Sequence, residues 1–235
     1  LTQGRFQLAA ATVGDAALFA GGWTTSGYSS RVDIVNGVGA VIGTSSLSQA
    51  REAMGATTVD GLAFFAGGYR GSGTYSNVVD MFDATGARVG GTTLSQARSY
   101  VAATTVGDLA LFAGGEYAAG SMTSVVDIFD ATSGTWTTSS LSTSRARLAA
   151  TTASGLAFFG GGSDGSSDSS VVDIFDSTGT LVGSVNLSQA RSFLAATAVG
   201  NSAIFAGGSR GGSPSNVIDV FEVTDSCTWT RPAAS

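Results

Sequence analysis

The chain has 235 residues, of which 43% are hydrophobic and 12% are charged, and its formal net charge is −6. This size and apolar content favour one folded domain, and the acidic excess argues against a nucleic-acid partner, because phosphate binding needs an excess of cations. Histidine is absent, which removes the usual general base at neutral pH and the commonest metal ligand, so we expect neither a metal nor another cofactor.

The sequence repeats with a period of 46 or 47 residues, and an arginine, a glycine pair and an aspartate recur at this spacing. The arginines are Arg5, Arg51, Arg98, Arg145 and Arg191. The glycine pairs begin at Gly21, Gly67, Gly114, Gly161 and Gly207, and the aspartates are Asp33, Asp80, Asp127, Asp173 and Asp219. Self-similarity at this period indicates one supersecondary unit that is copied and stacked. We divide a single domain, 1–235, into repeats 1–46, 47–93, 94–140, 141–186 and 187–235.

The third repeat illustrates the predicted elements in chain order. Its β-prone runs lie at 100–105 (YVAATT), 109–113 (LALFA), 125–130 (VVDIFD) and 135–137 (TWT), with turn residues at 106–108 and 131–134. Short β-prone runs between glycine-containing turns predict four antiparallel strands, a to d. No segment has the 3.6-residue apolar period of a helix.

Four strands in each of five repeats predict an all-β fold, a five-bladed β-propeller. An open stack of repeats would leave sheet edges and apolar faces exposed at both ends. Strand a lies nearest the axis, and its centre consists of Ala, Gly and Thr, which suit the crowded middle of a five-bladed ring. The alternative is that one or two blades are missing, because residues 1–4 (LTQG) match the linker LSQA at 47, 94 and 187.

The arginine before strand a, the glycine pair after strand b, the V-D-x-F-D of strand c and the tryptophan of strand d resemble the kelch repeat. The resemblance covers nearly the whole chain in five registered copies. It implies a β-propeller that commonly has six or seven blades and usually serves in interactions, although a fold alone does not fix a function. The strand-d tryptophan is kept at Trp136 and Trp229 and is replaced by Val41, Arg88 and Leu181.

In such a blade the d–a and b–c loops lie on one face, and the a–b and c–d loops lie on the other. The five arginines are therefore expected around one mouth of the central channel. One interpretation makes them a ligand site. The other makes them scaffolding, in which each arginine bonds an aspartate or a backbone carbonyl between neighbouring blades, because five unpaired cations would repel each other.

The b–c loops differ most between repeats, and variable loops on a repeated scaffold usually carry binding specificity. Exposed Tyr and Trp supply contact area at a low entropic cost. The candidate binding residues are Trp23, Tyr28, Tyr69, Tyr75 and Tyr117, together with Arg5, Arg51, Arg98, Arg145 and Arg191. The aromatic residues lie in the first three repeats, so we expect contacts to concentrate there.

These observations favour a non-catalytic module that mediates protein–protein interaction or self-assembly through its b–c face. A carbohydrate-binding, lectin-like propeller is the alternative, because aromatic and amide side chains recur around an axis. A glycosidase would need two carboxylates roughly 5 to 10 Å apart, and the a–b turn residues Asp15, Asp60 and Asp108 are the nearest candidates. A kelch-type copper oxidase needs histidine ligands, which the chain lacks.

No apolar run reaches the roughly 18 residues that cross a bilayer, so we expect no membrane insertion. The abundance of Gly, Ser, Thr and Ala suits an extracellular or cell-surface protein. Cys227 is the single cysteine and is expected to be a passive residue. Because the chain begins with Leu1, we expect processing or excision from a longer precursor.

Overall fold

The computed structural model describes residues 1–225 and 228–230, so Cys227 lies outside the described residues. Within this part of the chain every regular element is a β-strand, which confirms the predicted all-β fold. The same part contains no helix that is long and apolar enough to cross a membrane.

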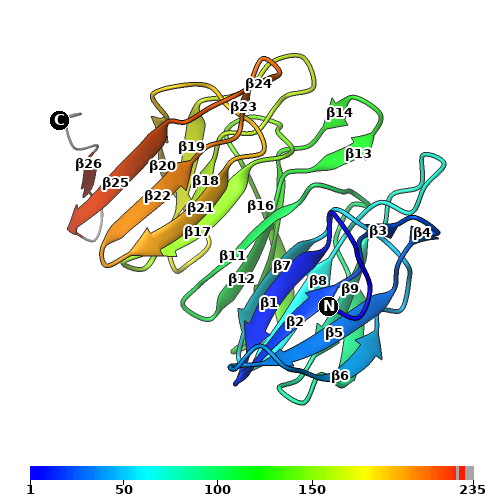
Figure 1. Cartoon of the computed structure of the whole chain (residues 1–235). Helices are drawn as coiled ribbons and strands as arrows, with labels where there is room; N and C mark the ends of the chain where they lie inside the picture. Colours follow the sequence, from blue (N-terminus) through cyan, green and yellow to red (C-terminus); the bar gives the residue numbers. More distant parts are fainter. Residues whose placement is uncertain (226–227, 231–235) are drawn as a thin grey trace. The chain divides into compact units, whose positions relative to one another are not determined.

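The described residues form five four-stranded antiparallel sheets, one from each repeat, in the strand order a-b-c-d (Figure 1). The first contains β1 (Ala9–Val13), β2 (Ala16–Ala20), β5 (Arg31–Asn36) and β6 (Val41–Ser46), and the second β7 (Gly55–Val59), β8 (Leu62–Ala66), β9 (Val78–Phe82) and β10 (Arg88–Thr93). The third contains β11 (Ala102–Val106), β12 (Leu109–Ala113), β15 (Val125–Asp130) and β16 (Thr135–Ser140). The fourth contains β17 (Ala149–Ala153), β18 (Leu156–Gly160), β19 (Val171–Phe175) and β20 (Leu181–Asn186). The fifth contains β21 (Ala195–Val199), β22 (Ser202–Ala206), β25 (Ile218–Asp225) and β26 (Thr228–Thr230).

Three b–c loops fold into short hairpins that the sequence did not predict. They are β3 (Trp23–Thr24) with β4 (Gly27–Tyr28), β13 (Glu116–Ala118) with β14 (Ser121–Met122), and β23 (Ser209–Arg210) with β24 (Ser213–Pro214). Each strand is only two or three residues long, which is too short for a periodic pattern to appear in the sequence.

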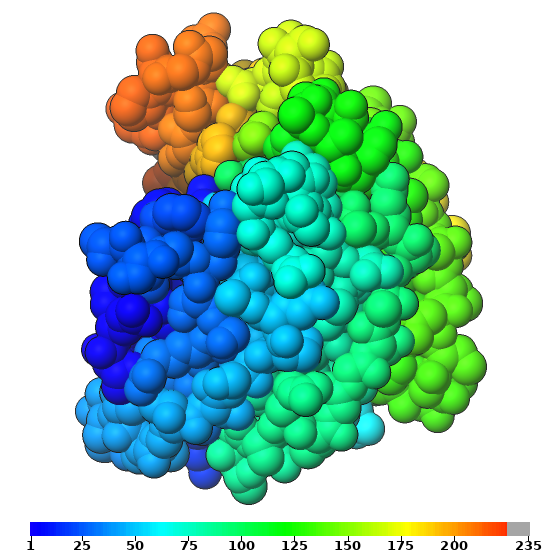
Figure 2. Space-filling view, turned by 90° about the vertical axis from the view of Figure 1, so that its right-hand side faces the viewer, coloured from blue at the N-terminus to red at the C-terminus, as the bar shows by residue number. Residues whose placement is uncertain are grey.

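The chain forms two compact units. The first consists of residues 1–101 with 117–119 and holds the first two sheets, and the second consists of residues 102–116 with those from 120 onward and holds the other three. Figure 2 shows the first repeat (blue) and the second repeat (cyan), both from the first unit, packed side by side.

The third sheet shows how well the strands were predicted. Strands b and c lie at 109–113 and 125–130 as expected, and Phe112 pairs with Asp127 across them. Strand a begins later than expected, at Ala102, because Tyr100 has a φ of 53° and cannot continue an extended strand. Strand d continues beyond the expected residue 137 to Ser140.

Each sheet has a front face and a back face. In four of the five sheets the front face carries a phenylalanine from strand b and one from strand c, such as Phe159 and Phe175, and in the first sheet it carries Phe19 and Val35. The back face carries large apolar residues from the same strands, such as Leu111 and Ile128 in the third sheet and Phe158 and Ile174 in the fourth. Strand b is apolar at successive positions because both faces are covered, so the alternation of a half-exposed strand is missing.

Neighbouring sheets within each unit stack front to back. In the second unit, Leu111 and Ile128 on the back of the third sheet share a buried cluster with Phe159 and Phe175 of the fourth sheet. The back of the fourth sheet meets Phe205 and its neighbours on the fifth in the same way. In the first unit, the back of the first sheet packs against the front of the second sheet. The same apolar interface is therefore built repeatedly from the same repeat positions.

The c–d turns are closed by the aspartates that end strand c. The Asp83 carboxylate accepts hydrogen bonds from the backbone N–H groups of Thr85 (2.9 Å) and Ala87 (3.1 Å). Asp130 and Asp176 make equivalent bonds in their own turns. Asp164 accepts from two successive backbone N–H groups in the b–c loop of the fourth repeat. These aspartates serve as turn residues, the role that aspartate side chains commonly play.

Candidate binding face

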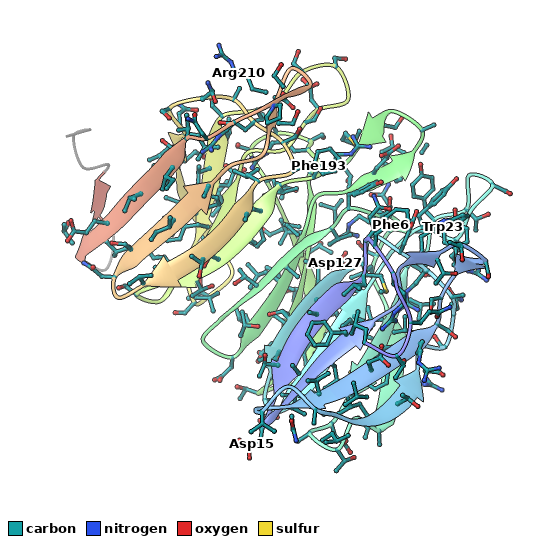
Figure 3. All side chains as sticks on the ribbon, in the orientation of Figure 1. Phe6, Asp15, Trp23, Asp127, Phe193 and Arg210 are labelled. Carbon is teal, nitrogen blue, oxygen red and sulfur yellow. The ribbon has the colours of Figure 1, made fainter. Side chains whose placement is uncertain are left out.

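The linkers that precede strand a pair with the starts of the b–c loops, and this pairing defines one end of each sheet, here called the b–c end. Phe6 and Trp23 exchange backbone hydrogen bonds of 3.1 and 2.9 Å. Glu52 forms the corresponding bridge with Tyr69 in the second repeat. Figure 3 shows Phe6 and Trp23 together at this end of the first sheet, with the a–b turn residue Asp15 at the opposite end. The expected sharing of one face by the d–a and b–c loops holds in these repeats.

The five arginines are buried scaffold residues. Arg145 has a side chain that is 1% exposed, and its guanidinium donates to the Asp173 carboxylate (2.6 Å) and to the carbonyls of Gly161 and Val171 (2.7 Å each). Arg191 makes the same three contacts in the fifth repeat. Arg5, Arg51 and Arg98 also have fully buried side chains. These arginines therefore do not offer their charge to a ligand at the surface, which corrects the prediction that they belong to the binding site.

The expected direction of the arginine bonds was also wrong, because the ion pairs form within one repeat rather than between neighbouring repeats. Arg51, for example, pairs with Asp80 of its own repeat at 2.9 Å. The link to the neighbouring repeat uses the arginine backbone instead, since the Arg51 carbonyl accepts from the N–H of Gly22 at 2.9 Å. The Arg191 carbonyl accepts in the same way from Gly162 at 2.8 Å. Arg51 and Arg191 thus each stabilise their own sheet with the side chain and join the preceding sheet with the backbone.

The ion pair between Arg5 and Asp33 affects the pKa of the Asp33 carboxyl. Its carboxylate accepts hydrogen bonds from the Thr2 hydroxyl and from the guanidinium groups of Arg31 and Arg5. Burial raises the pKa of Asp33, but these hydrogen bonds and the positive charge of Arg5 outweigh that effect, so the pKa lies below its ordinary value. Because the ionised form is favoured in the folded state, this carboxylate adds stability above its unfolded pKa of about 3.9 and loses it as the pH falls through the folded pKa.

We predict that Asp33→Asn reduces stability most at neutral pH. The difference in urea midpoint between the wild type and the variant should be largest at pH 7 and should shrink as the pH is lowered from about 4 to about 2, because the wild-type carboxyl then becomes neutral as well. Urea denaturation at a series of pH values measures this difference. A gap that stays constant over the series would show that the Asp33 charge contributes nothing.

A second set of residues at the b–c end was missed by the sequence analysis. The residue two positions after each repeated arginine has a left-handed backbone, with φ between 53° and 59°, although none of the five is a glycine. These left-handed residues are Gln7, Ala53, Tyr100, Arg147 and Phe193. Such a conformation is uncommon for non-glycine residues and costs about 1–3 kcal/mol, so it persists only where the surroundings enforce it, often at ligand sites.

Backbone hydrogen bonds between successive repeats hold these strained positions. In the first unit, Ala53 donates to the Gln7 carbonyl (3.0 Å) and Tyr100 donates to the Ala53 carbonyl (2.8 Å). In the second unit, Phe193 donates to the carbonyl of Arg147 at 3.0 Å. The strain is therefore offset by bonds that extend the connection from one sheet to the next.

The left-handed residues present different polar and apolar groups in the two units. In the first unit, the Gln7 amide lies between the Tyr100 hydroxyl (3.2 Å) and the Glu52 carboxylate (3.0 Å) in the orientation that satisfies both partners. Burial raises the pKa of this Glu52 carboxyl. In the second unit, Arg147 pairs with Glu116 at 2.8 Å and lies 5.4 Å from the ring centre of Phe193, which is 58% exposed (Figure 3).

Four of the five predicted loop aromatics form one contiguous cluster in the first unit. Trp23 packs edge-on against Tyr28, with ring centres 4.5 Å apart, and Tyr28 packs against Tyr69 at 5.9 Å. Tyr69 in turn contacts Tyr75 at 5.3 Å. These four side chains are half-buried, whereas Tyr117 is exposed. The cluster is a preformed aromatic surface whose rings fix one another's orientation.

The fourth and fifth repeats present a different surface at their b–c ends, with small and polar residues and no aromatic ring in the loops. A hollow of about 440 Å³ lies between these two loops and is lined by Ser163, Asp168 and Arg210 among other residues. The Asp168 carboxylate accepts from the Gly211 N–H at 2.7 Å and so connects the two loops. Among the residues that the structure describes, no group of three or more Cys, Asp or Glu side chains could hold a metal ion.

The a–b turn carboxylates lie at the opposite end of the sheets. Asp108 lines a hollow of about 560 Å³ together with Asp130 and Thr178, and its carboxylate accepts from the Thr132 hydroxyl at 3.3 Å. Asp15 and Asp60 occupy the corresponding turns of the first and second repeats. Each of the three carboxylates belongs to the turn of a different sheet.

No family model and no curated protein matches this chain. Among solved structures, the chain is similar to YjhT, with a TM-score of 0.76 and 18% sequence identity, over 97% of this chain and 84% of that one. YjhT is a β-propeller-type protein. This chain has a β-propeller-like fold. At this level of identity the likeness to YjhT extends to the fold alone.

Proposed function

We propose that this chain is a non-catalytic binding module that recognises a protein partner through its b–c end. The observation that carries the proposal is the set of left-handed residues. Their backbone is the same in every repeat, yet the side chains are Gln, Ala, Tyr, Arg and Phe. A strained backbone that presents a different side chain at each repeat is typical of a recognition surface, whereas a purely structural position would repeat its residue.

We further propose that the five sheets are kelch-type blades of one propeller. The buried arginine, the close glycine pair and the stacked front and back faces support this assignment. The five-bladed ring remains a prediction, because it requires the fifth sheet to find a neighbour in the first.

The aromatic cluster of the first unit is the proposed anchor. Trp23, Tyr28 and Tyr69 combine large apolar area with polar tips, the combination enriched at interface hot spots. The nearby Glu52 and Gln7 add an acidic and an amide group, which suits a polar rim around an apolar centre. We favour a protein over a glycan because the rings pack edge to face in a cluster instead of presenting one flat face to a sugar.

The proposal is tested by immobilising the chain and exposing it to the extracellular protein fraction of the organism that produces it. A retained protein should bind the double variant Trp23→Ala/Tyr69→Ala more weakly by about 2 kcal/mol, or roughly 30-fold, if these rings are anchors. Val38→Ala is the matched control, because Val38 is an 89% exposed apolar residue in a c–d turn at the opposite end. Circular dichroism checks that both variants remain folded.

Other outcomes would redirect the assignment. Loss of retention in Val38→Ala, but not in the double variant, would move the binding surface to the opposite end. Selective binding on a glycan array that the double variant abolishes would favour the lectin-like alternative. Turnover of a glycoside that depends on Asp15, Asp60 or Asp108 would replace the binding module with an enzyme.

A further inference from the structure

Glu52 begins a row of side chains at the b–c end of the second repeat. Its backbone exchanges hydrogen bonds of 3.0 and 2.8 Å with Tyr69, and Tyr69 is paired on its other side with Tyr75. Residues directly opposite each other in antiparallel strands place their side chains on the same face, with about 5 Å between the β-carbons. The Glu52 carboxylate and the Tyr69 and Tyr75 rings therefore lie side by side, and the two ring centres are 5.3 Å apart.

Tyr28 of the first repeat joins this row to Trp23. Trp23 and Tyr28 are also a directly opposed pair, and Tyr28 reaches Tyr69 with ring centres 5.9 Å apart. A β-carbon on Gly71 would lie 2.7 Å from the Tyr28 ring, so this ring is held against the b–c loop of the second repeat. Burial raises the pKa of Tyr28, and the negative charge of Glu52 adds to the rise. The aromatic cluster and one carboxylate thus form a single surface built from two neighbouring repeats of the first unit.

Glu52 has no cationic partner in the first unit. Its carboxylate accepts from the Gln7 amide at 3.0 Å, and among the described residues of this unit it forms no ion pair, even with Arg70 of the neighbouring loop. Glu116, the other glutamate at a b–c end, pairs with Arg147 at 2.8 Å. Burial raises the pKa of the Glu52 carboxyl, which means that its charged form is disfavoured where it lies. A cation placed beside this carboxylate would offset that cost.

The acidic residue is not part of the repeated scaffold. Among the positions directly after the repeated arginines, only that of the second repeat is acidic, and the other repeats have Phe6, Ser99, Ala146 and Ser192 there. A requirement of the fold would recur in the other repeats, as the buried arginine before it does. A carboxylate that occurs once in five copies, beside the aromatic cluster, is instead typical of recognition on a repeated scaffold.

We propose that Glu52 and the aromatic cluster bind a cationic side chain, an arginine or a lysine, of the protein partner. The ring faces carry negative electrostatic potential and accept a cation together with the aliphatic stem that bears it, while the carboxylate neutralises its charge. The net charge of −6 also favours the approach of a basic partner surface. This assignment rests on the proposed function and names the partner chemistry that the same surface recognises.

The first experiment selects peptides from a random phage-displayed library on the immobilised chain and keeps those that the Trp23→Ala/Tyr69→Ala variant no longer retains. These ring-dependent peptides should share an arginine or a lysine. Replacing that residue by its neutral counterpart, citrulline or acetyl-lysine, should weaken binding to the wild type roughly 10-fold. Ring-dependent peptides that lack a basic residue, or that bind equally well without its charge, would overturn this inference and leave the proposed function in place. A selection that yields no ring-dependent peptide would contradict both.

The second experiment tests the Glu52 charge. Glu52→Gln preserves the size of the side chain and a hydrogen-bond acceptor for Gln7, so it should weaken the basic peptide roughly 10-fold and its neutral counterpart much less. Glu222→Gln is the matched control, because it removes the same charge from a carboxylate that accepts from Asn201 at 3.3 Å at the a–b end of the fifth sheet. Equal weakening of the charged and neutral peptides by Glu52→Gln, or equal weakening of the basic peptide by Glu222→Gln, would show that Glu52 does not meet the cation.

Discussion

Arg145→Ala should lower the free energy of unfolding by about 3–5 kcal/mol, the usual cost of removing one member of a buried ion pair. The substitution leaves the Asp173 carboxylate buried without its charge partner and removes the donor to the carbonyls of Gly161 and Val171. Urea denaturation followed by circular dichroism measures the loss.

Arg147→Ala is the matched control, because Arg147 lies two residues away and its ion pair with Glu116 has a partly exposed side chain. A partly exposed pair of this kind contributes about 1 kcal/mol or less. Equal losses in the two variants would contradict the scaffold role of Arg145. Replacing both members, Arg145→Met with Asp173→Leu, should cost less than Arg145→Ala alone, since no buried charge remains unpaired.

The second large effect is expected at the first glycine of the repeated pair. Gly114 has a φ of 64°, and a β-carbon there would lie 2.3 Å from the carbonyl oxygen of Arg145. Gly114→Ala therefore combines the cost of a left-handed alanine with a clash between two backbones, and we expect a loss of about 2–5 kcal/mol.

Gly207→Ala separates these two contributions. Gly207 occupies the same repeat position with a φ of 67°, but the nearest atom to an added β-carbon is the Ser215 carbonyl oxygen at 3.8 Å. The 235-residue chain should then lose only the conformational cost of about 1–2 kcal/mol. Thermal denaturation of the two variants compares them directly. Equal losses of stability in the two variants would mean that the clash with the Arg145 carbonyl does not contribute to the destabilisation by Gly114→Ala.

Much of the fold was predictable because the repeat displays its strands five times. Strands b and c of the third sheet were placed to the residue, since their apolar runs end at a glycine pair or a turn. The start of strand a was misplaced because Tyr100 gives no sequence signal of its left-handed backbone. Glycine, asparagine and aspartate often adopt such a conformation, so their presence in a sequence can predict it. Tyrosine adopts it here only because its neighbours impose it.

The spacing of the arginines and aspartates does not predict which aspartate each arginine pairs with. Arg51 precedes Asp80 of its own repeat and follows Asp33 of the repeat before it, and both separations recur along the chain. A periodic sequence therefore cannot distinguish pairing within a repeat from pairing between repeats. The sequence contains one signal for the left-handed residues. The position two after each arginine varies from Gln to Ala, Tyr, Arg and Phe, whereas the rest of the linker is similar in every repeat.

Pairing within the repeat has a consequence for how such a chain grows. Because Arg145 meets Asp173 inside one repeat, a duplicated repeat carries its own charge neutralisation and a deleted repeat removes both partners together. Neither event leaves a buried ion without its counter-ion, which would otherwise cost several kcal/mol. The surfaces between sheets within a unit are interchangeable in the same sense, since the phenylalanines on the front of one sheet pack against apolar residues on the back of the sheet before it. A gene built from such units can therefore gain or lose a whole unit in one recombination event and still encode a protein whose interior charges are balanced.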